Sequence, residues 1–412
     1  MKDLSAAAFT FGIEEEFFLA RADDFSLPER LPDGFVAACR RSLGEWISRE
    51  LLQPQIEISS PVFHDEAGAR ERMAAFRRQL CDVADRFGLR PVASGTYPCG
   101  RWQQQWTTQE SRYAELREDF QIVGRRSLLC GLHVHVGIPE GVDRVMLMNR
   151  LMPWLPLFLA LSTSAPFWGG LRTGLKSYRQ VAYDEWPRSG IPDFFADEAD
   201  YDDFVALMQA TGAVNDASML WWTIRPAQRL PTLELRIADC CTDVEDTVAL
   251  ASLFRCLVRA HVRDSTRGRE RTTHTRRIID ENRWRAGRYG IEAEFIDEQQ
   301  RVNRPVRALV PDLLTMLADD IDALGCSTMP AQLQRILDRG TSADRQLAIY
   351  RRWRDEDGAS RDEALHAVAE WLAFSTRPGA SPPPGRARDD SRDSHNAVRS
   401  SAPAAVAAGC RP

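Results

Sequence analysis

The sequence lacks the patterns that mark several common protein classes. Its nine cysteines include no Cys-x-x-Cys pair, so the scatter fits reduced thiols in a cytosol better than a zinc ribbon or a disulfide framework. There is no basic excess, because the formal net charge is −6, and we therefore expect no nucleic-acid partner. The first residues, MKDLSAAAFTFGIEEEF, contain no apolar run of the length a signal peptide needs.

A long uninterrupted apolar run is also missing. The most apolar stretch, 145–161, is broken by Asn149, Arg150, Pro153 and Pro156. A helix that crosses a membrane needs about 20 predominantly apolar residues, so this stretch predicts a kinked core helix. We expect no membrane partner and a cytoplasmic location.

Familiar glycine motifs are absent too. Neither G-x-G-x-x-G nor G-x-S-x-G occurs, so nothing indicates a dinucleotide site or a hydrolase nucleophile elbow. The run 169–177 looks like a P-loop, but Leu175 separates its last glycine from Lys176. A P-loop needs the lysine directly after the glycine and a strand before the loop. We therefore reject this interpretation.

What is present is the composition of a soluble globular protein, with 44% hydrophobic and 27% charged residues. The length of 412 residues allows one large domain or two ordinary ones. From residue 376 onward the chain is rich in Pro, Ser, Arg and Ala, and few of its side chains could be buried. We predict one folded domain over 1–375 and a disordered tail over 376–412.

Four widely spaced segments of the domain have strand character: 9–19, 51–60, 128–138 and 231–240. Apolar residues repeat at helical spacing in 66–87, from 244 to 258, and through most of 308–374. Because the strands are few and seldom joined by tight turns, the pattern favours an α+β fold over a doubly wound one.

Each predicted strand carries polar residues two apart, which share one face of a strand. The pairs are Glu14 with Glu16, His133 with His135, and Glu234 with Arg236; Glu57 shares a face with Gln53 and Gln55 unless Pro54 introduces a bulge. On one sheet these groups would gather, and clustered carboxylates repel unless a cation neutralises them. Three glutamates with one histidine suit Mg²⁺ or Mn²⁺. The residues alone therefore predict a divalent-metal site on a β-sheet.

Each pair taken singly has a simpler interpretation. Exposed strand faces are polar in any case, a His-x-His pair is often structural, and Glu-x-Arg can be a surface ion pair. The metal hypothesis depends on four separate segments carrying such groups together.

Six runs of the sequence, in this order, resemble a known family. They are Phe11–Glu16 (FGIEEE), Glu50–Glu57 (ELLQPQIE), Cys130–Gly137 (CGLHVHVG), Trp222–Pro226 (WTIRP), Thr232–Arg236 (TLELR) and Asn282–Gly290 (NRWRAGRYG). The family is the type 2 glutamate–cysteine ligases, also called carboxylate–amine ligases. The resemblance covers roughly residues 9–296 and leaves the tail outside.

The resemblance implies a glutamine synthetase-like fold, in which a curved, mainly antiparallel sheet with flanking helices holds ATP, metal ions and substrate. It implies an ATP-dependent ligase that joins a carboxylate, glutamate in the family's name, to an amine such as cysteine. Members are taken to form an acyl phosphate, from which the amine displaces phosphate. The implied cofactors are ATP as co-substrate and Mg²⁺, with Mn²⁺ as the alternative. The implied partners are small-molecule amino acids. The resemblance does not decide between a monomer and a homodimer.

The resemblance also implies roles for residues at matching positions. It assigns the metal ions to Glu14, Glu16, Glu57, His133 and Glu234. It assigns catalysis to Arg236, on the transferring phosphate, together with Glu234. It assigns contact with ATP or substrate to Gln53, His135, Arg179, Arg225 and Arg285.

The sequence departs from the family at Arg172, where members often carry an acid nearby, and members of this branch tend to be weak glutamate–cysteine ligases. Three rival functions remain at this stage. A metallohydrolase could use His133 and His135, but it would not need nucleotide. A guanidino kinase would transfer phosphate without releasing it. A non-catalytic scaffold would have little reason to keep all the charged positions.

Overall fold

The computed structural model describes residues 4–110 and 113–380. It separates a large unit, residues 1–378, from a second unit, residues 379–412. Most of the expected tail, 381–412, lies outside the described residues. The helix α14 (Arg361–Thr376) includes the first residue of that expected tail.

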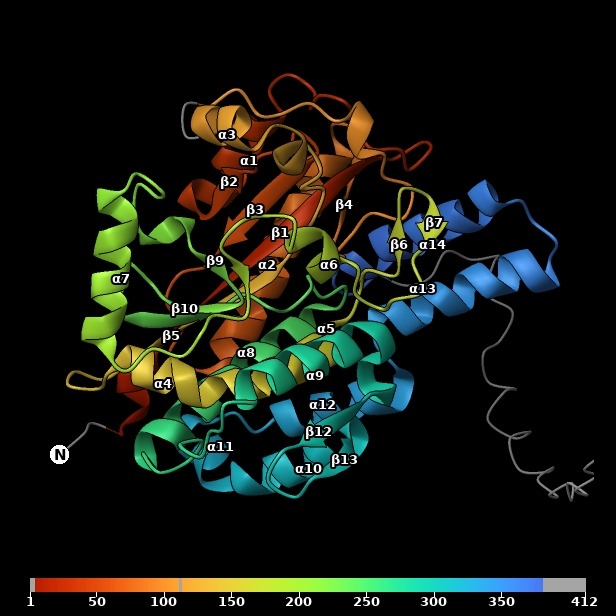
Figure 1. The fold of residues 1–412 in the computed structure, drawn as a ribbon. Helices are drawn as coiled ribbons and strands as arrows, with labels where there is room; N and C mark the ends of the chain where they lie inside the picture. The colour runs from red at the N-terminus through yellow and green to blue at the C-terminus, as the bar shows by residue number, and fades with distance from the viewer. Residues whose placement is uncertain (1–3, 111–112, 381–412) are drawn as a thin grey trace, which may run out of the picture. The chain divides into compact units, whose positions relative to one another are not determined.

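The centre of the large unit is a seven-stranded sheet (Figure 1). Its strands run in the order β10 (Ile224–Pro226), β11 (Thr232–Leu235), β5 (Leu132–Gly137), β1 (Phe11–Arg21), β3 (Gln55–Ser59) and β2 (Ile47–Arg49), while β4 (Leu89–Val92) also pairs with β1. Every pairing in this sheet is antiparallel. The prediction of an α+β fold with a mainly antiparallel sheet is confirmed.

The four predicted strands are present, but three of them are shorter than expected. The segment expected over 51–60 contributes only β3, because Gln53 and Pro54 form a turn before it. Proline lacks a backbone N–H group and is therefore confined to strand edges and bulges. Gln53 does not share the strand face with Glu57, whereas Gln55 does.

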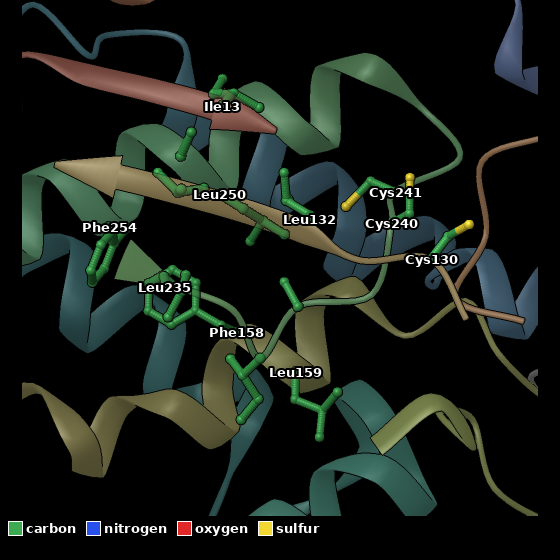
Figure 2. Packing of buried hydrophobic residues seen from close by; sticks show 14 of the residues in the cluster. Ile13, Cys130, Leu132, Phe158, Leu159, Leu235, Cys240, Cys241, Leu250 and Phe254 are labelled. Carbon is green, nitrogen blue, oxygen red and sulfur yellow. The ribbon is translucent and has the colours of Figure 1, made fainter. Parts of the chain in front are cut away.

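The apolar face of the sheet packs against α2 (Glu66–Asp85) and α8 (Val244–Arg263). Figure 2 shows side chains of this core, among them Ile13, Leu132 and Leu235 from the strands and Leu250 and Phe254 from α8. All five are at most 1% exposed. Burial of this face forces the alternate residues of each strand toward the opposite side of the sheet.

Glu15 is the exception on the apolar face of β1. Its side chain is fully buried and forms an ion pair with Arg77 of α2, whose Nε lies 3.0 Å from Glu15 Oε2. The hydroxyl of Thr247 on α8 donates a second hydrogen bond to Glu15 Oε1 at 2.6 Å. Glu15 therefore ties the sheet to both helices, while Glu14 and Glu16 point away from them.

The apolar stretch expected to be a kinked core helix consists of α4 (Arg144–Leu151), a short turn at Met152–Trp154, and α5 (Leu155–Ser162). By length and composition alone this stretch could cross a membrane, but 83% of its apolar window is buried inside the protein. It packs against α8 and α9 (Thr275–Tyr289) as part of the core.

The other described helices and small sheets surround this framework. The helices are α1 (Phe35–Leu43), α3 (Ala114–Arg125), α6 (Arg179–Tyr183), α7 (Glu198–Ala210), α10 (Val306–Met316), α11 (Ala318–Leu324), α12 (Met329–Arg339) and α13 (Ser342–Arg351). The two-stranded sheets are β6–β7 (Phe167–Trp168, Leu171–Arg172), β8–β9 (Ser189–Gly190, Trp221–Trp222) and β12–β13 (Glu294–Asp297, Val302–Pro305). The rejected P-loop candidate is the β6–β7 hairpin and the loop after it.

We predict that a truncation after Ala380 leaves the melting temperature unchanged, because the segment it removes has few residues that could be buried. A truncation before Thr376 should lower it by roughly 1–3 °C. The Thr376 hydroxyl is buried and accepts a hydrogen bond from the Ala93 N–H at 2.9 Å, and Arg377 forms ion pairs with Asp82 and Asp85. Thermal unfolding of the two truncated proteins beside the full chain tests this, and an equal loss in both would contradict it.

Candidate active site

The register of the sheet places the predicted polar residues on one face. Across the pairings, Glu14 lies opposite His133, Glu16 opposite Glu57, and Glu234 opposite both His135 and Arg225. Arg236 follows β11 directly, and its N–H continues the pairing with the Thr223 carbonyl at 2.8 Å. The face that packs against α2 and α8 carries Leu233, Leu235 and Ile237, all fully buried.

One group of carboxylates on this face could hold a metal ion. Carboxylate oxygens of Glu16, Glu50 and Glu57 all lie within 4.8 Å of one another. Burial and the negative charges of Glu14 and Glu16 raise the pKa of Glu57 to about 7. Carboxylate oxygens are ligands that Mg²⁺ takes, and a bound cation would remove the repulsion among the three groups.

A second group lies beside it and contains Glu14, His135 and Glu234, whose ligand atoms are also within 4.8 Å of one another. His135 Nε2 lies 3.5 Å from Glu14 Oε1 and 4.0 Å from Glu234 Oε1. Burial opposes ionisation of Glu14, but hydrogen bonds from His133 and His135 hold its pKa well below the usual range. Burial likewise opposes protonation of His135, but the hydrogen bond to Glu14 and the charge of Glu234 raise its pKa.

His133 contacts the second group. Its Nδ1 lies 3.3 Å from Glu14 Oε2, while its buried Nε2 has no hydrogen-bonding partner among the described residues. Burial and the charge of Arg236 lower the pKa of His133, which keeps the imidazole neutral. A neutral imidazole with an unsatisfied nitrogen fits a metal ligand.

Glu234 sits between two arginines. Arg225 Nε donates to its Oε2 at 2.7 Å, and Arg236 Nη1 donates to its Oε1. Burial opposes the charge of Glu234, but Arg236 and Arg225 hold its pKa far below the usual range. Glu234 therefore stays ionised, and it positions Arg236 as well as offering a ligand atom.

The guanidinium of Arg236 reaches a cavity above this face. The cavity is lined by Glu16, Glu50, Leu51, Gln55, Tyr113, Leu116, Ser127, Leu129, His133, Arg179, Tyr183, Trp186, Trp221 and Arg236. Arg236 Nη2 lies 3.3 Å from the Tyr183 hydroxyl, while its Nε is buried and without a partner among the described residues. An unpaired guanidinium nitrogen beside carboxylates is suited to a bound anion.

Arg179, at the start of α6, lies against the same cavity because residue 131 is glycine. A Cβ at Gly131 would come within 2.2 Å of Arg179 Nη2. Arg179 Nη1 donates to the Ala238 carbonyl at 3.2 Å, and its Nε has no partner among the described residues.

Three predicted or questioned residues lie elsewhere. Gln53 is in the turn before β3, and its N–H bonds to the Trp106 carbonyl. Arg285 on α9 bonds to Glu281, to the Glu294 carbonyl and to Asn303, which places it beside β12–β13. Arg172 is exposed on β7, with its guanidinium 6.0 Å from the Tyr350 ring centre.

Comparison with known proteins identifies the family. The sequence pattern of the glutamate–cysteine ligase family 2 matches residues 10–370. The chain belongs to this family. A relative from Ectopseudomonas mendocina, named "Putative glutamate–cysteine ligase 2", is 43% identical over 382 residues, which cover 89% of this chain and 97% of the relative. The family prediction is confirmed, and with it the prediction of an ATP-dependent ligase that forms an amide bond.

Solved structures of ligases share the fold of this protein. The glutamate–cysteine ligase of Francisella tularensis, solved with AMP, superposes with a TM-score of 0.64 at 11% identity, covering 92% of this chain and 90% of that one. A bifunctional glutathione synthetase from Pasteurella multocida gives a TM-score of 0.62 at 13% identity over 89% of this chain. This chain spans 52% of the length of that synthetase. At these identities the likeness concerns the fold alone.

Sequence reasoning did not assign several residues that line this site, among them Glu50, Gln55 and Tyr183. Glu50 completes the first carboxylate group. It lies just after β2, so the alternation of side chains along a strand does not predict where it points. Gln55 donates to the Leu129 carbonyl at 2.6 Å, and Tyr183 contacts Arg236. Glu50 and Gln55 lie in the run Glu50–Glu57, whose resemblance to the family could have pointed to them. No sequence pattern pointed to Tyr183.

Proposed function

We propose that the protein is an ATP-dependent carboxylate–amine ligase with weak glutamate–cysteine ligase activity, acting through an acyl phosphate at the cavity described above. The observation that carries the proposal is the placement of Arg236 in one cavity with Glu16, Glu50 and His133. A phosphoryl-transfer site needs a cationic side chain that can contact phosphoryl oxygens, and it needs carboxylates that bind metal ions. This cavity contains both.

The proposed reaction has two steps. A carboxylate oxygen attacks the γ-phosphorus of ATP and ADP leaves, which gives an acyl phosphate. The amine, bound as an ammonium ion, releases one proton to solvent. Its nitrogen then attacks the acyl carbon, the C–O bond to phosphate breaks, and phosphate leaves with the second amine proton. The products are an amide, ADP and phosphate.

The residues would divide this work. Arg236 would contact two oxygens of the phosphoryl group in transit, and Glu234 with Tyr183 would hold its guanidinium in place. Glu16, Glu50 and Glu57 would hold one Mg²⁺ or Mn²⁺, and Glu14, His133, His135 and Glu234 are the candidates for a second. The bound ions would screen the triphosphate charge. Arg179 would contact the substrate carboxylate, and Arg225 would act through Glu234.

Two further parts belong to the proposal. The substrates are small molecules, with L-glutamate and L-cysteine as the first pair to test. The location is the cytoplasm, which the eight free thiols of the described residues support.

The proposal predicts that ADP and phosphate are released only when ATP, Mg²⁺, a carboxylate and an amine are all present. A coupled assay with L-glutamate and L-cysteine, omitting one component at a time, measures this. Turnover that continues without nucleotide would favour the hydrolase. A phosphorylated amine without free phosphate would favour the kinase. Either result would end the proposal.

A further inference from the structure

The cavity of the proposed ligase has a charged part and an aromatic part. Glu16, Glu50 and His133 come from or beside the sheet, whereas Trp186 and Trp221 come from the segments around β8–β9. The apolar part of the lining is completed by Leu51, Leu116 and Leu129. Cysteine, with its small thiol, would leave this aromatic surface largely unused.

The two tryptophans pack against each other and against neighbouring side chains. Their ring centres lie 4.9 Å apart at 72°, and Phe120 on α3 packs against both, at 4.9 Å from Trp186 and 5.5 Å from Trp221. Arg188 covers Trp221 and Phe120 at 5.3 and 6.0 Å, and its Nε donates to the Met219 carbonyl. Aromatic side chains packed in this way offer a ligand contact area at low entropic cost.

Cations are few in this cavity. Among the lining residues in the described part of the chain, Arg179 and Arg236 are the only lysine or arginine side chains. Arg236 already pairs with Glu234, and one fork nitrogen of Arg179 points at the carbonyls of residues 236–238, 3.2–3.5 Å away. The guanidinium nitrogens that remain on Arg179 and Arg236 suit the carboxylate of the acyl substrate and the phosphoryl group.

A second carboxylate, brought by an α-amino acid as the amine, would meet no further lysine or arginine side chain among the described residues of the lining. Its burial against the two tryptophans would cost free energy that no ion pair offsets. An ammonium group has no such penalty, because aromatic faces attract a cation.

We propose that the preferred amine substrate is a primary amine with an apolar, aromatic body and no carboxylate group. This inference rests on the proposed function, since it assigns the amine of the same site. It explains why an α-amino acid such as cysteine would be a poor amine substrate.

The test compares pairs of amines that differ only in the carboxylate: phenethylamine with L-phenylalanine, and cysteamine with L-cysteine. Calorimetric titration of the full-length protein, with Mg²⁺ and a non-hydrolysable ATP analogue, measures binding without turnover. We expect the member without a carboxylate to bind about 10- to 100-fold more tightly in each pair, and phenethylamine to bind most tightly of the four. Equal affinity, tighter binding of the amino acids, or no binding of any amine would overturn the inference.

Three variants make the test specific to this surface. Trp221→Leu should weaken phenethylamine binding at least about tenfold. Trp222→Leu is the matched control, because Trp222 packs instead against Phe195, Tyr201 and Phe204. It should leave the affinity unchanged, and an equal loss in both variants would overturn the inference.

Leu116→Arg adds a cation to the lining and should shift the preference toward L-phenylalanine; an unchanged ratio would contradict the charge argument. These binding results are independent of the ADP assay. If the amines bind as expected and no ADP is released, the proposed reaction fails and the amine site stands. If ADP is released and cysteine binds more tightly than cysteamine, the reaction stands and this inference fails.

Discussion

Replacing Arg236 by lysine should lower kcat by roughly 10²-fold or more and leave ATP affinity nearly unchanged. The lysine keeps the charge but loses the planar fork that can contact two phosphoryl oxygens at once. The loss should fall on kcat because those contacts form with the phosphoryl group in transit. Steady-state kinetics with a nucleotide-binding isotherm on this variant measure both quantities.

The alternative is that Arg236 is only a structural partner of Glu234, with which it forms a buried ion pair. Arg259→Lys is the matched control, because Arg259 forms a similar buried pair with Asp320 and does not line the cavity. It should lose stability with little change in kcat. A near-normal kcat for Arg236→Lys, or an equal fall in both variants, would remove Arg236 from the mechanism.

Replacing Glu16 by glutamine should raise the Mg²⁺ concentration for half-maximal rate at least about tenfold. The substitution keeps the shape and removes one charge from the group with Glu50 and Glu57. The free energy of unfolding without metal should hold or increase, because Glu57 then has one fewer negative neighbour. A metal titration of the rate and thermal unfolding in a chelator measure the two effects.

Glu15→Gln is the control for this prediction, since it makes the same change one residue away on the opposite face of β1. It weakens the fully buried pair with Arg77 and should cost about 3 kcal/mol of unfolding free energy, while the metal titration stays unchanged. If Glu16→Gln left the metal requirement unchanged, the glutamate would be part of a solvated strand face and not a ligand.

Strand alternation predicted much of the site. A period of two correctly placed Glu14, Glu16, His133, His135, Glu234 and Arg236 on one face, because the apolar residues between them are buried against α2 and α8. Their convergence from three strands required only that the strands share one sheet. The sequence could not reveal that register, which brings Glu16 opposite Glu57.

The remaining features depend on irregular chain segments, where no period applies. Glu50 belongs to the first carboxylate group but lies outside a strand. Gln53 lies in a turn together with Pro54. Arg179 approaches the sheet only because Gly131 lacks a side chain. Arg285 belongs to a run that resembles the family, yet its contacts lie with β12–β13. A shared motif does not by itself place a residue in a cavity.

The central claim, an acyl phosphate formed at Arg236, has one direct test. The enzyme is supplied with a carboxylate substrate labelled with ¹⁸O in both carboxylate oxygens, together with ATP, Mg²⁺ and an amine, and the released phosphate is analysed by mass spectrometry. Transfer through an acyl phosphate predicts one ¹⁸O atom in the phosphate for each amide formed. Amide formation with unlabelled phosphate would contradict the account.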